Sequence, residues 1–370
     1  MKVLMQIRDN YLTSPGGDSI QFLKTKEYLT KMGISVDVSI ELEPDLSGYD
    51  IVHLFNLTRI QETYIQAKNA IKQNKPYCLS TIYWPFDEMN KKGINGLRKI
   101  LYSCFTGNQI ERLKALYKFV FKRQRNKGCR KLIFGSYSKM QKFVVENSSI
   151  CLPNSSIEMV KIYETLKTKE KKYVVVPNGL DLNNVIEASL ADVNEYEKYR
   201  GFIVCVARIS QRKNQLLLVE AFKKTAFKLL FVGKSSPGEM KYYKKFIKEI
   251  EGCSNIEYIE SIPNKDIYKL YKVCKVSVLP SWFETPGLVS LEAAAMGCNI
   301  AITDKGTTRD YFGDYAFYFD LNKEDVYEKV VMAYNAPFNE ELRAKILSSY
   351  TWEQAAIKTI DGYNEALKNA

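Results

Sequence analysis

The chain has 370 residues, of which 46% are hydrophobic and 26% are charged, and its formal net charge is +12. This length allows two domains with substantial cores, and the composition is that of an ordinary globular protein, which argues against a disordered chain. No apolar run reaches the roughly 18 residues of a membrane-spanning helix, and the first residues lack the apolar core of a signal peptide, so we expect a cytoplasmic protein.

The first half of the sequence alternates between predicted strands and helices. The expected strands are residues 2–7, 34–40, 49–57 and 76–84, and the expected helices are residues 19–33 and 60–75. A loop containing Pro15, Gly16 and Gly17 follows the first strand. Later segments, residues 131–138 and 149–156, are also predicted to be strands, each followed by a helix.

The positive charge is concentrated in residues 91–131. This segment holds thirteen Lys and Arg residues against one acid, Glu111, and that excess of twelve equals the net charge of the whole chain. Apolar and aromatic residues interleave with the basic ones at roughly helical spacing, which suits a helix lying on an anionic membrane surface. The alternatives are an ordinary helix with a solvated basic face and a nucleic-acid patch. We rank the patch last, because no recognised nucleic-acid module surrounds it.

The second half repeats the alternation. Strands are expected at residues 172–181, 201–210, 227–234, 255–261, 276–281 and 298–304, with helical patterns between them from residue 214 onward. Strands separated by helices indicate parallel sheets. With a break near residues 160–175, the pattern predicts two α/β Rossmann-like domains that face each other across a cleft. Ligands of such sheets bind at the carboxyl ends of the strands.

Metal ligands are sparse in this sequence. The eight cysteines are far apart, none of them in a Cys-x-x-Cys pair, and His53 is the only histidine. A structural zinc site needs a cluster of such ligands, so we expect no metal site and no cofactor.

Charged residues follow two of the expected strands of the second half. Arg208 and Lys213 come after residues 201–207, and two cations beside the amides of a helix start suit a diphosphate. Glu284 follows the strand at 276–281, and Glu292 lies about one turn inside the next helix. A carboxylate there can accept hydrogen bonds from two adjacent hydroxyls such as a ribose diol. The alternative interpretation is a surface glutamate on a helix.

Residues 280–310, PSWFETPGLVSLEAAAMGCNIAITDKGTTRD, closely resemble the donor-site signature of the retaining glycosyltransferases of family 4, which have the GT-B fold. The similarity to this family extends to VPNGLD at 176–181, VARISQRKN at 206–214 and CLPNSSIEM at 151–159. It also includes PGGDS at 15–19 and YTWEQAA at 350–356. The match spans the chain and is thin between about residues 80 and 135.

The resemblance implies a domain organisation. Residues 1–170 would form the acceptor-binding domain and residues 171–349 the nucleotide-sugar-binding domain, and a helix in residues 350–370 would cross back onto the first domain.

The resemblance also implies the roles of residues on the donor side. Arg208 and Lys213 would neutralise the diphosphate, Glu284 would hold a sugar hydroxyl, and Glu292 the ribose hydroxyls. Arg208, Lys213 and Glu284 are therefore the predicted catalytic residues. The remaining predicted donor contacts are backbone or loop positions: Gly16, Gly17, Ile262, Thr285, Pro286, Gly287 and Leu288.

The acceptor side departs from the family pattern. Many members carry a histidine soon after the strand that corresponds to residues 76–84, where this chain has Tyr83, Trp84 and Pro85. Tyr83, Trp84, Asp87 and His53 are the candidate acceptor-binding residues. For His53 a buried residue at the end of a strand is favoured over a catalytic role, and Tyr83 and Trp84 are alternatively core residues.

The sequence thus predicts a retaining hexosyltransferase that uses a UDP- or GDP-sugar and a saccharide or lipid-linked saccharide acceptor, in surface polysaccharide or glycolipid synthesis. No Asp-x-Asp motif is present and the Arg-Lys pair can supply the positive charge, so we expect a metal-independent reaction. Its location would be cytoplasmic, with peripheral attachment to the inner face of the plasma membrane through residues 91–131. The alternatives are an epimerase or phosphorylase of the same fold, or a non-enzymatic basic protein that binds membrane or nucleic acid.

Overall fold

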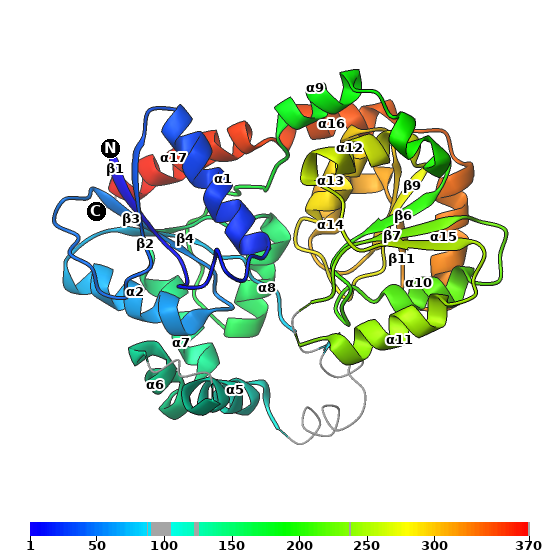
Figure 1. Ribbon diagram of the computed structural model, residues 1–370. Coiled ribbons are helices and arrows are strands. Elements are labelled where there is room, and N and C mark those ends of the chain that lie inside the picture. Colours follow the sequence, from blue (N-terminus) through cyan, green and yellow to red (C-terminus); the bar gives the residue numbers. More distant parts are fainter. Residues whose placement is uncertain (87, 90–104, 122–125, 237, 369–370) are drawn as a thin grey trace. The chain divides into compact units, whose positions relative to one another are not determined.

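The computed structural model describes residues 1–86, 88–89, 105–121, 126–236 and 238–368. The chain forms two compact units (Figure 1), and the first contains Met1–Asn178 together with Trp352–Ala370. The second is continuous and contains Gly179–Thr351. The C-terminal helix α17 (Trp352–Lys368) therefore belongs to the first unit, where it packs against α1 (Gly17–Lys31).

The first unit is built on a five-stranded parallel sheet. Its strand order is β2-β1-β3-β4-β5. The strands are β1 (Lys2–Gln6), β2 (Ser35–Ser39), β3 (Ile51–Phe55), β4 (Tyr77–Ser80) and β5 (Ile150–Cys151). The central strands β3 and β4 are buried along their whole length, as expected for a parallel sheet covered on both faces.

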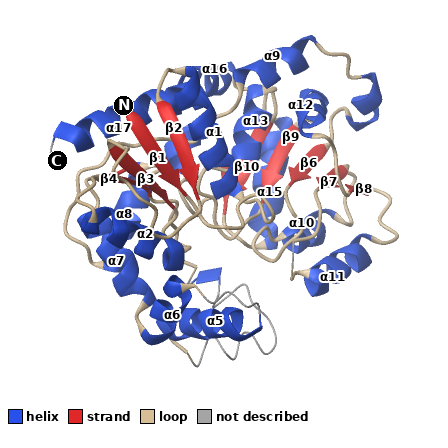
Figure 2. Cartoon of the chain, turned by 60° about the vertical axis from the view of Figure 1, so that its left-hand side comes forward, coloured by secondary structure: helices blue, strands red, loops and turns tan. Residues whose placement is uncertain are grey.

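Helices cover both faces of this sheet, as Figure 2 shows. Helices α1 and α17 pack together beside β2, β4 and β5, and α2 and α7 form a second helical layer that packs on β3. Helices α5 and α6 attach to this layer, because α6 packs on α2 and α5 on α7. The bounds are α2 (Ile60–Lys72), α5 (Gly107–Phe121), α6 (Lys127–Phe134), α7 (Tyr137–Asn147) and α8 (Ser156–Leu166).

The second unit is built on a six-stranded parallel sheet of order β11-β10-β9-β6-β7-β8. The strands are β6 (Ile203–Val206), β7 (Leu229–Val232), β8 (Ile256–Ile259), β9 (Val276–Leu279), β10 (Asn299–Thr303) and β11 (Phe317–Phe319). Helices α12 and α13 pack together on one side, and α10 and α15 on the other. The helices are α9 (Leu182–Leu190), α10 (Gln215–Phe222), α11 (Met240–Ile250), α12 (Asn264–Val273), α13 (Leu288–Ala295), α14 (Thr308–Phe312), α15 (Lys323–Asn335) and α16 (Glu340–Ser349), with short 3₁₀ helices at Asn194–Tyr199 and Gly313–Tyr315.

The predicted strand at residues 131–138 is wrong. These residues span the end of α6 and the beginning of α7. The side chain of Asn126 accepts a hydrogen bond from the Cys129 amide, and Ser136 does the same for the Lys139 amide. These two N-caps stabilise a pair of short helices, and the apolar run between them reads equally well as strand or helix.

Residues 172–181, predicted as a strand, form isolated bridges in place of a regular strand, and the first of these bridges is to β5. The Cys151 amide donates to the Lys172 carbonyl over 3.1 Å, and the Val174 amide donates to the Cys151 carbonyl over 3.0 Å. The pairing amounts to an isolated bridge between Cys151 and Tyr173. Pro177 has no amide hydrogen to donate, which limits how far such pairing extends.

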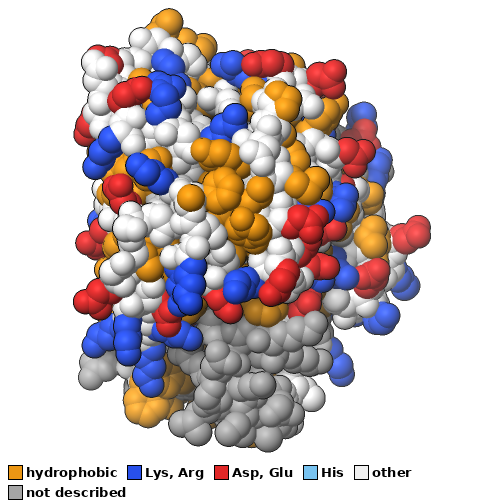
Figure 3. All heavy atoms as spheres, turned by 90° about the vertical axis from the view of Figure 1, so that its right-hand side faces the viewer, with side chains coloured by type: hydrophobic (Ala, Val, Ile, Leu, Met, Phe, Trp, Pro, Cys, Tyr) orange, Lys and Arg blue, Asp and Glu red, His pale blue; other side chains and the backbone are white. Residues whose placement is uncertain are grey.

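On the face drawn in Figure 3, Lys and Arg side chains are interspersed with Asp and Glu, in keeping with a net charge that arises mainly from residues 91–131. Among the described residues, no helix is both long and apolar enough to cross a bilayer.

Candidate functional site

The centre of the candidate site is an ion pair between two loops of the second unit. Lys213 lies in the loop from β6 to α10, and Glu284 lies in the loop from β9 to α13. Strands β6 and β9 are parallel neighbours, so their carboxyl ends lie at one edge of the sheet. There the Lys213 Nζ donates to the Glu284 Oε1 over 2.5 Å.

Arg212 is the third member of this ion-pair cluster. Its Nη1 lies 3.7 Å from the Glu284 Oε1 and donates to the Phe283 carbonyl over 3.2 Å. The Trp282 amide in turn donates to the Arg212 carbonyl over 2.9 Å, so the two loops are tied by backbone as well as by charge. Sequence analysis missed Arg212, although its position beside Lys213 was a signal for it.

The electrostatics of the cluster favour charged groups. Burial raises the pKa of Glu284, but Lys213 and Arg212 lower it by more, so this pKa lies below its usual range and the side chain is a carboxylate. Burial lowers the pKa of Lys213, and Glu284 offsets part of that effect. Two cations against one carboxylate leave a net positive charge at the strand ends.

Arg208 lies just after β6 with an exposed side chain, and its carbonyl accepts a hydrogen bond from the Gln215 Nε2 over 3.0 Å. The structure thus places Arg208 at the predicted strand end. The cations beside Glu284 are Arg212 and Lys213.

The loop that carries Glu284 is clamped to the loop after β10. The Glu284 amide donates to the Lys305 carbonyl over 3.1 Å, and the Thr307 amide donates to the Glu284 carbonyl over 2.9 Å. The Thr307 hydroxyl also donates to the Thr285 carbonyl. Gly306 has φ +105°, and a Cβ there would lie 1.8 Å from the Glu284 carbonyl oxygen, so only glycine fits.

The same loop leads into the start of α13. Gly287 is the N-cap residue in the left-handed conformation, with φ 65°. Thr285 and Leu288 are half-buried, whereas Pro286 and Gly287 are buried. The first amides of a helix have no partner within it and point outward from its N-terminus, which suits an anion.

Glu292 has a different environment from Glu284. It is partly buried in α13, beside Tyr268 and Tyr271 of α12. Burial raises the pKa of Glu292 to about 7, and a hydrogen bond from the Tyr268 hydroxyl lowers it only in part. Ile262, another predicted donor contact, is half-buried in the segment between β8 and α12 and packs against the core of the second unit.

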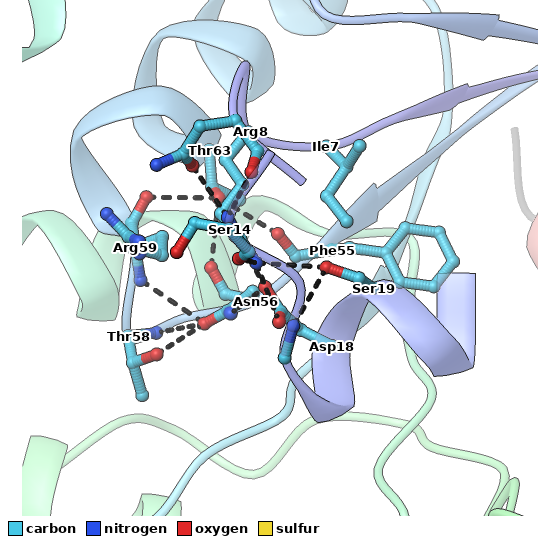
Figure 4. Close-up of polar contacts among 12 residues, drawn as sticks. Ile7, Arg8, Ser14, Asp18, Ser19, Phe55, Asn56, Thr58, Arg59 and Thr63 are labelled. Carbon is cyan, nitrogen blue, oxygen red and sulfur yellow. Dashed lines mark hydrogen bonds and ion pairs between the residues drawn. The ribbon is translucent and has the colours of Figure 1, made fainter. Parts of the chain in front are cut away.

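In the first unit, Gly16 is the N-cap residue of α1 and Gly17 its first residue. The preceding loop is held by the buried Arg8, whose guanidinium binds Asp18 over 2.7 and 3.1 Å, the Ser14 carbonyl over 3.0 Å and the Ser19 hydroxyl over 2.9 Å (Figure 4). Asn56 donates to the same Asp18 carboxylate over 3.1 Å. Burial raises the pKa of Asp18, but Arg8 and Asn56 lower it by more. Sequence analysis missed this network.

His53 lies in the middle of β3 and not at its carboxyl end. It is the third of five residues in β3 and is fully buried. Its Nδ1 lies 2.7 Å from the Tyr363 hydroxyl and its Nε2 lies 2.9 Å from the Ser80 Oγ. Burial lowers the pKa of His53 to about 3, so the ring is neutral and both nitrogens are engaged. We therefore withdraw His53 as an acceptor contact in favour of the buried alternative.

The other acceptor candidates follow β4. Tyr83 is 6% exposed and lies in the core of the first unit, and its hydroxyl is 2.9 Å from the Thr165 Oγ1. Trp84 is partly buried, with the Lys161 Nζ 5.8 Å from its ring centroid. Asp87 lies outside the described residues.

Comparison with known proteins finds a family model that matches most of the second unit. The family model described as glycosyl transferases group 1 matches residues 186–346. A 4-alpha-N-acetylgalactosaminyltransferase of Campylobacter jejuni, which acts on N-acetylgalactosamine-N,N'-diacetylbacillosaminyl-diphospho-undecaprenol, is 29% identical over 188 residues, 49% of each chain. O-antigen chain mannosyltransferase C of Escherichia coli is 26% identical over 160 residues, 42% of each chain. These matches span about half the length of either relative.

The fold of the whole chain also has solved counterparts. HepE of Anabaena, solved in complex with UDP, superimposes with a TM-score of 0.70 at 13% identity, over 98% of this chain and 100% of that one. The two parallel-sheet Rossmann-like domains therefore match the GT-B fold. The part of the chain that matches the group 1 glycosyltransferase model, residues 186–346, lies within the second unit.

Proposed function

We propose that the protein is a retaining glycosyltransferase that moves a hexose-type sugar from a UDP- or GDP-sugar to a saccharide or lipid-linked saccharide acceptor. The observation that carries this proposal is the ion-pair cluster of Lys213, Arg212 and Glu284, which lies at the carboxyl ends of β6 and β9 beside the start of α13. Cations and helix-start amides at such a strand end are suited to binding a diphosphate. The match of residues 186–346 to the group 1 glycosyltransferase model supports a nucleoside-diphosphate sugar as the ligand.

The cluster suits the charge that develops during sugar transfer. As the bond to the diphosphate breaks, negative charge grows on the leaving group, and fixed cations lower the barrier when they are already in place. Glu284 holds Lys213 with its ammonium at the strand edge before any ligand binds. When the diphosphate binds, it shares Lys213 and Arg212, and Glu284 is left to accept a hydrogen bond from a sugar hydroxyl. Because these side chains supply the positive charge, we propose a metal-independent reaction.

Glu292 is proposed to hold the ribose. Its carboxyl group lies in the second turn of α13 beside the Tyr268 hydroxyl. Two ribose hydroxyls would donate to the ionised form, so donor binding would lower the pKa of Glu292 from its raised value.

The acceptor is proposed to be membrane-linked. The relative from Campylobacter acts on a diphospho-undecaprenol saccharide, and α5 of this chain has an amphipathic surface that we call the α5 apolar face. Its exposed members recur at helical spacing: Leu113 (46%), Leu116 (44%), Tyr117 (54%), Val120 (50%) and Phe121 (71%). Arg112, Lys114 and Lys118 lie on the same helix. Such a face suits the surface of an anionic bilayer. Of the basic segment, residues 91–104 and 122–125 lie outside the described residues, and residues 127–131 form the first part of α6.

A donor panel tests the transferase proposal. The full chain is incubated with UDP-, GDP- and dTDP-hexoses, with the diphospho-undecaprenol saccharide named for the relative as acceptor probe, and release of nucleoside diphosphate is measured with and without a chelator. We expect turnover with one nucleotide, no loss with chelator, and a product whose anomeric configuration by NMR is that of the donor. A product with the inverted anomeric configuration would contradict the retaining mechanism, and a lower rate with chelator would contradict metal independence. No turnover of any donor would contradict the function.

Lys213→Ala provides the site-directed arm of this experiment. We expect a loss of about 10²–10³-fold in kcat, the range found when one preorganised charge-stabilising group is removed. Lys223→Ala is the matched control, because Lys223 forms a surface ion pair with Glu249 over 2.9 Å in the same unit. Equal rates in the two variants would show that Lys213 does not stabilise the leaving group.

Membrane attachment is tested by sedimentation with vesicles. Wild type is expected to bind phosphatidylglycerol vesicles and not phosphatidylcholine vesicles, with binding that weakens as salt rises. Leu116→Asp with Val120→Asp should abolish this binding, and Leu190→Asp, at an 84% exposed leucine of α9, should leave it unchanged. Binding that survives the double change would exclude the α5 apolar face.

A further inference from the structure

Glu158 is a buried carboxyl group at the carboxyl edge of the first sheet. It is the third residue of α8, and no part of its surface is exposed to solvent. Its Oε1 accepts hydrogen bonds from the Tyr83 amide over 2.7 Å and from the Thr81 hydroxyl, and its Oε2 accepts from the Asn154 amide over 3.0 Å. One side chain therefore joins the exits of β4 and β5.

All three of these donors are neutral groups. Burial raises the pKa of Glu158 to about 7, and the hydrogen bonds from Thr81, Tyr83 and Asn154 offset only part of that rise. An apolar side chain of similar size would avoid this electrostatic cost. The hydrogen bonds are thus the feature that explains a carboxyl group at this position.

The segment that Glu158 holds is conformationally strained. Ile82, between Thr81 and Tyr83, has φ 41°. A β-branched residue rarely adopts a positive φ, and such strain persists only where surrounding contacts fix it. Glu158 supplies contacts on both sides of Ile82. Strained residues also concentrate at ligand sites, which gives this turn a functional context.

Residues around Glu158 connect the turn to two other segments. The Asn154 Oδ1 accepts a hydrogen bond from the Gln21 Nε2 of α1 over 2.9 Å, in a buried position. Lys161, one turn after Glu158 on α8, places its Nζ 5.8 Å from the ring centroid of Trp84. The start of α8 thus contacts both the residues after β4 and the first helix after the Gly16–Gly17 loop.

We propose that Glu158 is a positioning residue for the acceptor: it fixes the turn from Thr81 to Tyr83 so that Trp84 lies at the carboxyl edge of the first sheet, where the acceptor saccharide binds. This inference rests on the proposed transferase function, with the acceptor bound by the first unit. It predicts that loss of the Glu158 hydrogen bonds weakens acceptor binding and leaves donor chemistry intact.

Two conservative variants test the proposal. In Glu158→Gln the side-chain NH₂ group replaces one carboxyl oxygen, so it faces a hydrogen-bond donor and at least one of the three hydrogen bonds is lost. Thr81→Val removes one donor and keeps the shape of the side chain. We expect the KM for the diphospho-undecaprenol saccharide to rise about tenfold in Glu158→Gln and about threefold in Thr81→Val, the effect of one or two lost hydrogen bonds. The donor KM, and the rate of donor hydrolysis without acceptor, should stay within about twofold of wild type.

Hydrogen exchange gives a readout that does not need turnover. The Tyr83 amide should exchange at least about tenfold faster in Glu158→Gln, because its acceptor is weakened. Amides of β7 in the second unit should be unchanged. Glu353→Gln is the control, since Glu353 is an exposed carboxylate in the first turn of α17; it should match wild type in both measurements.

The outcomes separate this inference from the proposed function. Faster Tyr83 exchange with an unchanged acceptor KM would make Glu158 a purely structural residue and overturn the proposal. Equal changes in donor and acceptor KM would overturn it as well, as would unchanged exchange of the Tyr83 amide in Glu158→Gln. A wild type that transfers nothing would refute the transferase function instead, while the exchange experiment still reports whether Glu158 holds the turn.

Discussion

Two glutamates of the second unit, eight positions apart, have opposite electrostatic environments. Glu284 lies beside Lys213 and Arg212 and is ionised, whereas Glu292 lies beside two tyrosines and has a pKa of about 7. Sequence analysis located both residues and Lys213, since strand, loop and helix patterns place them at one sheet edge. It could not assign their protonation, because burial and neighbouring charges arise only when the strands pair.

Glu292 should make stability depend on pH. Its pKa is about 7 in the folded chain against an ordinary 4.5, so its contribution is complete below pH 4.5 and is lost as pH rises through 7. We expect the unfolding free energy of wild type, minus that of Glu292→Gln, to fall by about 3 kcal/mol over this interval. Urea titrations at several pH values measure it. A difference that is constant or rises with pH would contradict the raised pKa.

Arg212, Arg8 and Glu158 were missed at the residue scale for a common reason. Each forms contacts with residues from other loops: Arg212 with Glu284, Arg8 with Asp18 and Glu158 with Tyr83. The periodicity of a sequence reports which face of an element is buried, and it does not report which polar side chains meet after loops fold.

At the scale of elements, the clamp between the Glu284 loop and the loop after β10 depends on Gly306. Gly306→Ala should lower the unfolding free energy by about 2–4 kcal/mol, because it combines a positive φ with a backbone clash, and should raise the donor KM. Gly252→Ala is the matched control: φ there is +76°, and a Cβ added at this position would have no other atom within 4 Å.

The unfolding free energy of Gly252→Ala should fall by only about 1–2 kcal/mol, which is the cost of the left-handed conformation alone, and its donor KM should be unchanged. Thermal unfolding and donor titrations measure both effects. If the two alanine variants behave alike, the contact between Gly306 and Glu284 is not what holds the loop.

Element type was predictable where the chain alternates regularly. All the predicted strands of residues 201–304 correspond to observed parallel strands, because each is an apolar run bounded by helical patterns. The exception at residues 131–138 shows the limit. There, capping by Asn126 and Ser136 selects two helices for a short apolar run that periodicity cannot classify.

At the scale of the molecule, the chain returns to its first unit through α17. The Tyr363 hydroxyl of this helix lies 2.7 Å from the buried His53 Nδ1, so residues 310 positions apart share one core. Tyr363→Phe should lower stability by about 1–3 kcal/mol, because it leaves a buried ring nitrogen without a partner. Tyr117→Phe, at a 54% exposed tyrosine, is the control and should be neutral.

Urea unfolding of both phenylalanine variants checks this expectation, together with the donor KM, which should not change in either. A neutral Tyr363→Phe would show that the contact between α17 and β3 contributes little. A donor KM that rises in Tyr363→Phe alone would place His53 and α17 in the donor site, against the assignment made above.

The central claim is that the strand ends of the second unit bind a nucleoside diphosphate through Lys213 and Glu292. Isothermal titration of the full chain with UDP and with GDP tests it most directly, in wild type, Lys213→Ala, Glu292→Ala and the surface control Lys223→Ala. The account predicts that one of the two nucleotides binds wild type and the control equally and binds the two site variants at least about tenfold more weakly. Equal affinity in all four proteins, or no binding of either nucleotide to wild type, would contradict it.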